Sequence, residues 1–458
     1  MTNTRFERLA RSERRIRARD LVESIIPLTT AIAVALFFVD GGFTNFFSLD
    51  TLPYAIGVVS GLIGSNLFLV MLVLAARVPA IDRIFGHDRA LELHKKLGKP
   101  VFYLLVVHAA ALIVDWANRS GQDYFSQAIQ MFFKDTDLLM AFLAIGVLSV
   151  VIITSLVAVK RRLPFQVWHI IHLLTYAALL LGVFHQFSWS GMFREGTVSR
   201  WYWLALYIGA VSSLLVFRFL IPMFRSLRYG LVVERVVVEA PGVVSITMRG
   251  KELLSAGFAA GKFAHWRFLS RELWLEAHPF SISAAPTNET IRVTVRDLGD
   301  ATEIMQRLTP GTRVWFEGPY GIFTETVRTK DRIALIGAGI GLAPIRALAE
   351  SLETRPGELV VIGRANDESQ LFLKDEILEV TKAKQGQAFW LTGSRGGRDS
   401  WLPRVKRESG LTIADFVRNP QTVDFYICGP LQWMNSLILE LKSLGVPEEN
   451  VHYEKFAW

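Results

Sequence analysis

Hydrophobic residues follow two different patterns along the 458-residue chain. Up to about residue 230 they form long runs, and most of these approach the roughly 20 residues that a membrane-spanning helix needs. Beyond residue 230 the runs are short and are separated by Gly and Pro, which is typical of strands and turns. The long runs lie at 25–39, 53–76, 100–114, 138–159, 167–187 and 201–224.

The first run has only 15 clean apolar residues, so it could also be the core of a signal peptide. The sequence that follows it is Asp40-Gly41-Gly42-Phe43, which is not a small-residue cleavage site. We therefore interpret the run as an uncleaved first span. The first half of the chain is then predicted to be a bundle of six transmembrane helices, at 25–228, after a basic tail at 1–24.

The charge distribution supports six spans. The chain has 50 Lys and Arg against 42 Asp and Glu, and its net charge is +8. Residues 1–230 carry +9 and residues 231–458 carry −1. With six spans, 18 basic residues fall on one side of the membrane and four on the other, so the positive-inside rule places both termini in the cytoplasm. The excess of positive charge is an orientation signal of a multi-pass cell-membrane protein in contact with lipid, and no nucleic-acid partner is needed to explain it.

Composition excludes several other classes. Apolar residues make up 51% of the chain and charged residues 20%, and the mean hydropathy is +0.32, which excludes a disordered or fibrous protein. Cys428 is the single cysteine. It rules out a disulfide framework, a Cys-ligated zinc site and a protein-bound iron–sulfur cluster.

Six of the nine histidines lie between residues 87 and 185, inside or beside the predicted spans. His94 and His108 are 14 residues apart on the third helix, so they point in the same direction with a rise of about 21 Å between them. The fifth helix runs in the same direction, and its His172 and His185 match these two depths. Each pair could hold a haem through two axial imidazoles, a ligation that suits electron transfer.

The spacing of the second pair is less regular. Thirteen residues place His172 and His185 about 140° apart on an ideal helix. Either a local bulge near Gly182 rotates one of them, or the helix presents two flanks to two haems. His169 competes with His172 as the inner ligand.

The second half is predicted to contain two domains. Short β-rich runs at 231–238, 243–248, 291–295 and 313–316 predict a small antiparallel β-barrel at 229–329. From Arg332 the pattern becomes strand, Gly-rich turn and helix, repeated, which predicts a doubly wound α/β domain at 330–458.

Five motifs in this half bear on cofactor chemistry. His278-Pro279-Phe280-Ser281-Ile282-Ser283 combines an aromatic ring, hydroxyls and a basic group, as a flavin site requires. Arg296, Gly299 and Thr302 begin a predicted helix that could bind phosphate, and Glu317-Gly318-Pro319-Tyr320-Gly321 is a tight turn. The strongest motif follows an apolar strand and consists of Gly337, Gly339, Gly341 and Pro344; the glycines allow the backbone to approach a pyrophosphate at a helix N-terminus. Cys428-Gly429-Pro430 ends a strand about 90 residues later.

The order of these motifs resembles the ferredoxin-NADP reductase superfamily. Joined to six helices with histidine pairs, the chain from about residue 20 to 458 resembles the bacterial branch of the NADPH oxidase/ferric reductase family. The resemblance implies two b-type haems, with His94 and His172 on the inner one and His108 and His185 on the outer one. It also implies FAD at His278, Phe280 and Ser281, and NADPH at the glycine-rich loop and at Cys428, Gly429 and Pro430.

The resemblance extends to the nucleotide's phosphate and to the end of the chain. Members that use NADPH carry Ser-Arg after the third strand of this domain, and Ser394-Arg395 fits, with Arg364 and Arg398 nearby. A terminal aromatic residue often covers the flavin ring, a role open here to Trp458 or Phe456. Eukaryotic oxidases have a further histidine one turn after the outer ligand, and this chain has Leu112 there.

The predicted function is transfer of electrons from cytoplasmic NADPH through FAD and two haems to an acceptor across the membrane. Oxygen, reduced to superoxide, is the first candidate, and Fe(III) is the alternative; Leu112 leaves the acceptor open. Two other classes are a haem subunit that serves a partner protein, and a transporter whose histidines line a pore. A haem spectrum distinguishes the transporter.

Overall fold

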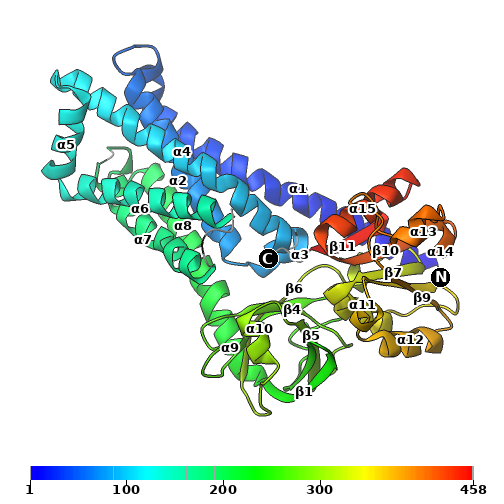
Figure 1. The fold of residues 1–458 in the computed structure, drawn as a ribbon. Coiled ribbons are helices and arrows are strands. Elements are labelled where there is room, and N and C mark those ends of the chain that lie inside the picture. The colour runs from blue at the N-terminus through cyan, green and yellow to red at the C-terminus, as the bar shows by residue number, and fades with distance from the viewer. Residues whose placement is uncertain (1, 86, 160–162, 164, 190, 456–458) are drawn as a thin grey trace. The chain divides into compact units, whose positions relative to one another are not determined.

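The computed structural model describes residues 2–85, 87–159, 163, 165–189 and 191–455 (Figure 1). The chain divides into two compact units. The helical unit comprises residues 18–78 and 89–216, and the mixed unit comprises residues 1–17, 79–88 and 217–458.

Six described helices are long and apolar enough to cross a membrane, which confirms the prediction of six spans. A helix satisfies its own backbone hydrogen bonds, as the apolar interior of a bilayer demands. The helices of this part are α1 (Thr2–Val39), α2 (Leu52–Ala75), α4 (His87–Ser120), α5 (Tyr124–Lys134), α6 (Thr136–Val159), α7 (Phe165–Trp189) and α8 (Val198–Ser213), with short 3-10 turns η1 (Gly42–Phe46) and η2 (Gly191–Phe193). From α8 the chain continues as the π-helical η3 (Leu214–Leu220) and as α9 (Ile221–Tyr229), while α3 (Pro79–Phe85) lies between α2 and α4.

Three glycines of α2 face α4. A Cβ on Gly57 would lie 2.8 Å from a Leu112 side-chain carbon, one on Gly61 would lie 2.4 Å from His108 Nδ1, and one on Gly64 would lie 3.0 Å from a Leu105 side-chain carbon. Small residues let transmembrane helices approach closely, because helix association in lipid depends on packing. The two helices are therefore close enough for the backbone of α2 to touch side chains of α4.

Two three-stranded antiparallel sheets, in the orders β1-β2-β5 and β4-β3-β6, form the first part of the mixed unit. Isolated bridges between Ile282 and Val293 and between Val232 and Arg313 join the sheets, which confirms the predicted antiparallel β-domain. Trp266 fills its core and donates from Nε1 to the Phe280 carbonyl at 2.9 Å. The elements are β1 (Val232–Ala240), β2 (Val243–Arg249), β3 (Phe263–Phe268), β4 (His278–Ser281), β5 (Thr290–Arg296), α10 (Asp300–Met305) and β6 (Val314–Tyr320).

A parallel sheet of order β11-β10-β7-β8-β9 forms the second part, and confirms the doubly wound prediction. Side chains of β7 alternate: Ile333 and Leu335 pack on the side of α11 and α12, while Ala334 and Ile336 pack with α15. Helices α11 and α12 lie on one face of the sheet and α15 on the other (Figure 1). The strands are β7 (Arg332–Ala338), β8 (Leu359–Ala365), β9 (Gln387–Thr392), β10 (Val423–Gly429) and β11 (Val451–Lys455). The helices are α11 (Leu342–Ser351), α12 (Lys374–Ala383), α13 (Arg404–Glu408), α14 (Ile413–Phe416) and α15 (Leu431–Ser443), with 3-10 turns η4 (Glu325–Val327), η5 (Gly339–Gly341), η6 (Glu368–Gln370), η7 (Pro420–Thr422) and η8 (Glu448–Asn450).

An ion-pair cluster joins the two parts of the mixed unit. Arg292 on β5 donates two hydrogen bonds to the Glu376 carboxylate of α12, at 2.9 and 2.8 Å. Arg346 on α11 contacts the same carboxylate at 2.8 Å. Burial raises the pKa of Glu376, but hydrogen bonds and charge from Arg292 and Arg346 outweigh it and leave the pKa lowered. The carboxylate therefore stabilises the fold in its ionised form.

We expect Glu376→Gln to lower the stability of the unit by about 1–2 kcal/mol at neutral pH, because two charge-assisted hydrogen bonds weaken. That corresponds to roughly 2–6 °C in the thermal midpoint. The folded pKa is lowered, so the contribution is present above the unfolded pKa of about 4.3 and is lost as the pH falls through the folded pKa. Circular dichroism melting of the full chain measures it. Glu379→Gln, at an exposed position of α12, is the control, and equal midpoints for both variants at pH 7 would contradict the prediction.

Candidate active site

The structure brings the four predicted histidines together in two pairs within the helical unit. The ring centroids of His94 and His172 are 6.2 Å apart, and those of His108 and His185 are also 6.2 Å apart. Each pair joins α4 to α7. His169, the alternative to His172, is exposed.

A separation of 6.2 Å fits one metal ion held between two imidazoles. A metal–nitrogen bond is about 2 Å long, and the ring centre lies roughly 1.2 Å behind the nitrogen, so two trans imidazoles have centroids about 6.4 Å apart. The same distance in both pairs indicates two equivalent sites at two depths.

The second ring nitrogens of the α4 histidines meet backbone carbonyls of α2. His108 Nδ1 lies 2.8 Å from the Gly57 carbonyl, and His94 Nδ1 lies 3.1 Å from the Met71 carbonyl. Only a protonated Nδ1 can donate to a carbonyl, which leaves the Nε2 lone pair available to a metal. Gly57 and Met71 are 14 residues apart, the same interval as His94 and His108.

The α7 histidines have different surroundings. His172 Nδ1 lies 3.5 Å from Ser155 Oγ, which also accepts a hydrogen bond from Trp168 Nε1 at 3.1 Å. The Trp168 ring lies 5.0 Å from that of His172. Within the described chain, His185 Nδ1 is buried without a hydrogen-bond partner.

The geometry of α7 bears on the 140° angle between its histidines. Phe165–Trp189 is α-helical throughout, including Gly182. Both histidines nevertheless reach their partners on α4. The helix therefore presents two flanks, and no bulge is needed.

The flavin motif lies on β4 and in the segment after it. His278 and Phe280 have nearly parallel rings with centroids 6.3 Å apart. Burial lowers the pKa of His278, against the opposing charge of Glu276, so the imidazole is neutral at pH 7. Ser281 Oγ is buried and has no hydrogen-bond partner among the described residues, as expected of a hydroxyl that bonds a bound ring. Pro279 lies between the two rings in sequence, and Ser283 Oγ accepts from Arg292 at 3.2 Å.

The predicted phosphate site at Arg296, Gly299 and Thr302 is split. Thr302 Oγ1 accepts from the Gly299 and Leu298 amides at 3.1 and 2.8 Å, so the hydroxyl caps its own turn. Arg296 points elsewhere: its Nη1 lies 3.8 Å from where a Cβ on Gly339 would be. The arginine thus lies beside the glycine-rich loop.

The glycine-rich loop and the Cys-Gly-Pro motif lie on neighbouring strands, β7 and β10. Strands β8 and β9 continue the sheet on one side of this pair and β11 on the other, so the motifs flank the point where strand order reverses, which is where doubly wound sheets bind nucleotides. A Cβ on Gly341 would lie 2.1 Å from the Cys428 carbonyl oxygen, so only glycine fits. Pro344 lies in the first turn of α11, and Gly429 and Pro430 lead into α15. The Cys428 thiol is fully buried.

Two arginines end the neighbouring strands. Arg364 closes β8 and donates from Nη2 to the Gly393 carbonyl at 2.7 Å. Arg395 donates to the Gln432 carbonyl and to Ser436 Oγ, each at 3.0 Å. Burial lowers the pKa of both groups, and the charge of Arg395 lowers that of Arg364 further. Among the described residues neither has an ion-pair partner, so positive charge is available to an anion.

Several residues with a part in these sites were not predicted. They are Gly57, Met71, Ser155, Trp168 and Arg292. The Gly57, Gly61 and Gly64 spacing in an apolar run was a signal for close helix packing. The carbonyl of Met71 left no signal, because any residue type carries one. Phe456 and Trp458 lie outside the described residues.

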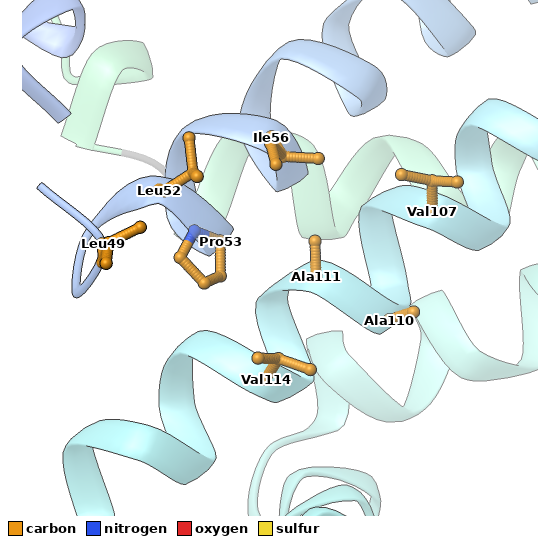
Figure 2. A pocket seen from close by; sticks show the side chains of 8 residues that line it. All are labelled: Leu49, Leu52, Pro53, Ile56, Val107, Ala110, Ala111 and Val114. Carbon is orange, nitrogen blue, oxygen red and sulfur yellow. The ribbon is translucent and has the colours of Figure 1, made fainter. Parts of the chain in front are cut away.

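An apolar hollow of about 380 Å³ lies between α2 and α4 (Figure 2). Of the residues that line it, Val107 directly precedes His108, Ala111 follows His108 by three residues, and Ile56 precedes Gly57. The figure shows only apolar side chains around it: Leu49, Leu52, Pro53, Ile56, Val107, Ala110, Ala111 and Val114.

Fold and motifs together define a membrane oxidoreductase that uses a flavin and a nicotinamide nucleotide. Three family models match the chain: a ferric reductase like transmembrane component at residues 60–183, an FAD-binding domain at 231–324 and an oxidoreductase NAD-binding domain at 335–437. This combination of three domains in one chain fits the NADPH oxidase/ferric reductase family.

Individual relatives are distant. The flavohemoprotein of Halalkalibacterium halodurans is 23% identical over 246 residues, which are 49% of this chain and 59% of that protein. NADPH oxidase 1 of Rattus norvegicus is 29% identical over 157 residues, 33% of this chain and 26% of that protein. A solved flavohem-like FAD/NAD-binding domain of nitric oxide dioxygenase from Vibrio cholerae is 19% identical, with 50% of this chain and 98% of that one covered and a TM-score of 0.41. The chain spans about half the length of the flavohemoproteins it matches.

We expect Gly61→Ala to weaken the His108–His185 site selectively. The new Cβ would meet His108 Nδ1 at 2.4 Å, and the imidazole is already held by the Gly57 carbonyl, so ring or helix must move. Overpacking of this kind costs about 1–3 kcal/mol. Haem content and the midpoint potential of the retained haem measure the effect. Gly182→Ala, where nothing lies within 4 Å of the new Cβ, is the control, and unchanged potentials and haem content in Gly61→Ala would refute the positioning.

Proposed function

We propose that the chain carries electrons from cytoplasmic NADPH through FAD and two b-type haems to O2 on the far side of the membrane. The observation that carries the proposal is the pair of equal 6.2 Å imidazole separations, in one chain with flavin and nucleotide domains. His94 and His172 would hold the inner haem, and His108 and His185 the outer one. A pore lined by histidines would not require two matched separations.

The cofactors supply the redox chemistry: a flavin accepts an electron pair and releases single electrons, and haem iron carries one electron at a time. The chain binds and orients them. Ser281 offers its hydroxyl to the flavin ring beside Phe280. The backbone amides of Gly337, Gly339 and Gly341 would bind the nucleotide's pyrophosphate, and Cys428 would lie at the nicotinamide side of the same crevice. Phe456 and Trp458 are proposed to cover the flavin ring.

The arginines at the ends of β8 and β9 support NADPH over NADH. Arg364 and Arg395 carry positive charge without a carboxylate partner among the described residues, and Ser394 precedes Arg395. Guanidinium groups suit the 2′-phosphate that distinguishes the two nucleotides. Their carbonyl contacts fix the direction of both side chains.

An apolar hollow between α2 and α4 supports O2 as the acceptor. It is lined by apolar side chains alone, among them Val107, the sequence neighbour of His108, and such a lining suits a small apolar molecule better than a hydrated ferric chelate. Fe(III) is the second candidate, and the match to a ferric reductase like transmembrane component favours it. Delivery to a partner protein is a third route, and the chain's own nucleotide domain argues against it.

We propose that both termini are cytoplasmic, on the distribution of Lys and Arg described above. Exposed apolar side chains on the spanning helices, such as Ile170, Leu180 and Ile208, would contact lipid.

Purified full-length protein is expected to show a b-type haem spectrum and to form superoxide faster than Fe(II) when supplied with NADPH and either acceptor. His108→Ala and His185→Ala should each remove about one haem of two and slow reduction of the acceptor by at least about tenfold, since the last carrier is lost. Flavin reduction by NADPH should remain. His169→Ala, at the exposed neighbour, is the matched control. The absence of a haem spectrum in the wild type, or haem unchanged in both variants, would sink the proposal; faster Fe(II) formation would change the acceptor alone.

Arg395→Ala is expected to raise KM for NADPH by roughly 10- to 100-fold, because a charge-assisted contact to phosphate contributes about 1.5–3 kcal/mol. KM for NADH should change by less than about threefold. Steady-state reduction of the flavin with each nucleotide measures both constants. Arg404→Ala, an exposed arginine paired with Glu408, serves as the control. An equal loss for NADH and NADPH would show that the arginine supports the fold and does not bind the 2′-phosphate.

A further inference from the structure

The last helical run of the chain ends in contact with the sheet β4-β3-β6, which carries the flavin motif. The proposed function assigns no role to this contact. The run passes from α8 through the π-helical η3 into α9, and η3 carries Arg218 within an otherwise apolar sequence. π-helical turns are rare and often occur at functional sites. Arg218, α9 and the sheet belong to the same compact unit, which resumes at Phe217.

Three side chains of this helix end hold three consecutive residues of β6. Arg218 Nη1 donates to the Glu317 carboxylate at 2.6 Å. Arg225 donates to the Gly318 carbonyl and, from its other terminal nitrogen, to the Ala256 carbonyl.

Ser226 completes the contact at the neighbouring position. Its Oγ accepts from the Phe316 amide at 3.0 Å. The Arg225 guanidinium also lies 5.5 Å from the centre of the Phe316 ring. We call Arg218, Arg225 and Ser226, with Phe316, Glu317 and Gly318, the helix-end clamp.

The strand in the clamp is rigidly connected to the flavin motif. Strand β6 pairs with β3, and β3 pairs with β4, which carries His278–Ser281. Trp266 of β3 lies between them: its ring is 6.2 Å from that of Phe316, and its Nε1 bonds the Phe280 carbonyl. A displacement of β6 would therefore move the flavin motif.

An irregularity in the backbone of β6 leaves a carbonyl for Arg225 to bind. The register between β3 and β6 shifts between Phe263 and His265, next to Gly318 and Pro319. Such a bulge interrupts the ladder and turns a carbonyl outward. Arg225 supplies hydrogen bonds at this interruption.

The sheltered charges of the clamp contribute little to the free energy of folding, so stability alone does not explain them. The Arg218 and Glu317 side chains are only 27% and 16% exposed, and a buried ion pair often adds little net stability because both charges lose water. One turn further along, Arg228 and Glu252 form a looser pair at 3.5 Å with both side chains about 70% exposed. Only the sheltered pair connects the helix to the flavin-motif sheet.

We propose that Arg218, Arg225 and Ser226 are positioning residues that hold the flavin motif for electron transfer into the membrane haems. The proposal rests on the function proposed above. Loss of the clamp leaves hydride transfer from NADPH to the flavin intact, because the nucleotide site lies on the other sheet. It slows the single-electron transfer from flavin to haem, a step in which no bond forms or breaks.

The test compares two rates in purified full-length protein. Arg218→Gln, Arg225→Gln and Glu317→Gln should slow reduction of haem by NADPH at least about tenfold. Reduction of ferricyanide, which takes electrons directly from the flavin, should stay within about twofold. Arg228→Gln on the same helix is the control and should match the wild type in both. Hydrogen exchange of residues 316–320 should be faster in Arg225→Gln than in Arg228→Gln.

Each outcome decides the proposal. Haem reduction in the clamp variants equal to that in Arg228→Gln overturns it, as does unchanged hydrogen exchange. Where single variants lose flavin or fold poorly, the exchanged pair Arg218→Glu with Glu317→Arg should restore haem reduction, and failure to restore it also overturns the proposal. A wild type without NADPH-reducible haem sinks the proposed function instead, and hydrogen exchange of residues 316–320 in Arg225→Gln against Arg228→Gln then still tests whether the clamp holds β6.

Discussion

A histidine buried in a transmembrane bundle carries two polar ring nitrogens away from water, and among the described residues His94, His108 and His172 have a polar group near Nδ1 while His185 has none. Unpaired polar atoms are costly away from water. Carbonyls of α2 take one nitrogen of His94 and of His108, and the opposite imidazoles on α7 stand at the distance that a shared metal requires. The helix α2 contributes no predicted ligand, yet it fixes the tautomer of two of the four histidines. Its glycines bring its backbone close enough to do so.

The mixed unit depends on a different constraint: its backbone must come close enough to bind a phosphorylated cofactor. Gly341 is in contact with the Cys428 carbonyl, which joins the glycine-rich loop to the Cys-Gly-Pro motif across the switch point of the sheet. Arg364 lies near the end of β8 and Arg395 follows β9, and neither forms an ion pair among the described residues, although the Asp399 carboxylate lies close enough to act on Arg395 electrostatically. The chemistry of the site thus depends on the ends of β7, β8, β9 and β10 meeting at one edge.

The helix-end clamp connects the end of the last helical run to the strands that carry the flavin motif. Strands β6, β3 and β4 form one hydrogen-bonded sheet, and side chains of η3 and α9 hold its edge. The sequence predicted a tight turn at Glu317-Gly318-Pro319-Tyr320-Gly321, but the structure places Glu317–Tyr320 in strand β6, where this segment provides the contacts of the clamp. Arg218, which lies in an otherwise apolar helical run, pairs with Glu317.

Local patterns were enough to determine much of this protein. Apolar runs of spanning length predicted six helices, because a bilayer permits little else, and alternation with Gly-rich turns predicted the two folds of the mixed unit. The 14-residue interval between His94 and His108 placed them on one face, because helical periodicity is a property of the backbone alone. Pairing of His172, and not His169, was decided only in the tertiary structure, since it depends on how α4 and α7 pack. The same holds for the Gly57 and Met71 carbonyls and for Arg218 with Glu317, 99 residues apart. A carbonyl has no sequence signature, and a distant ion pair has no period, so packing alone brings them together.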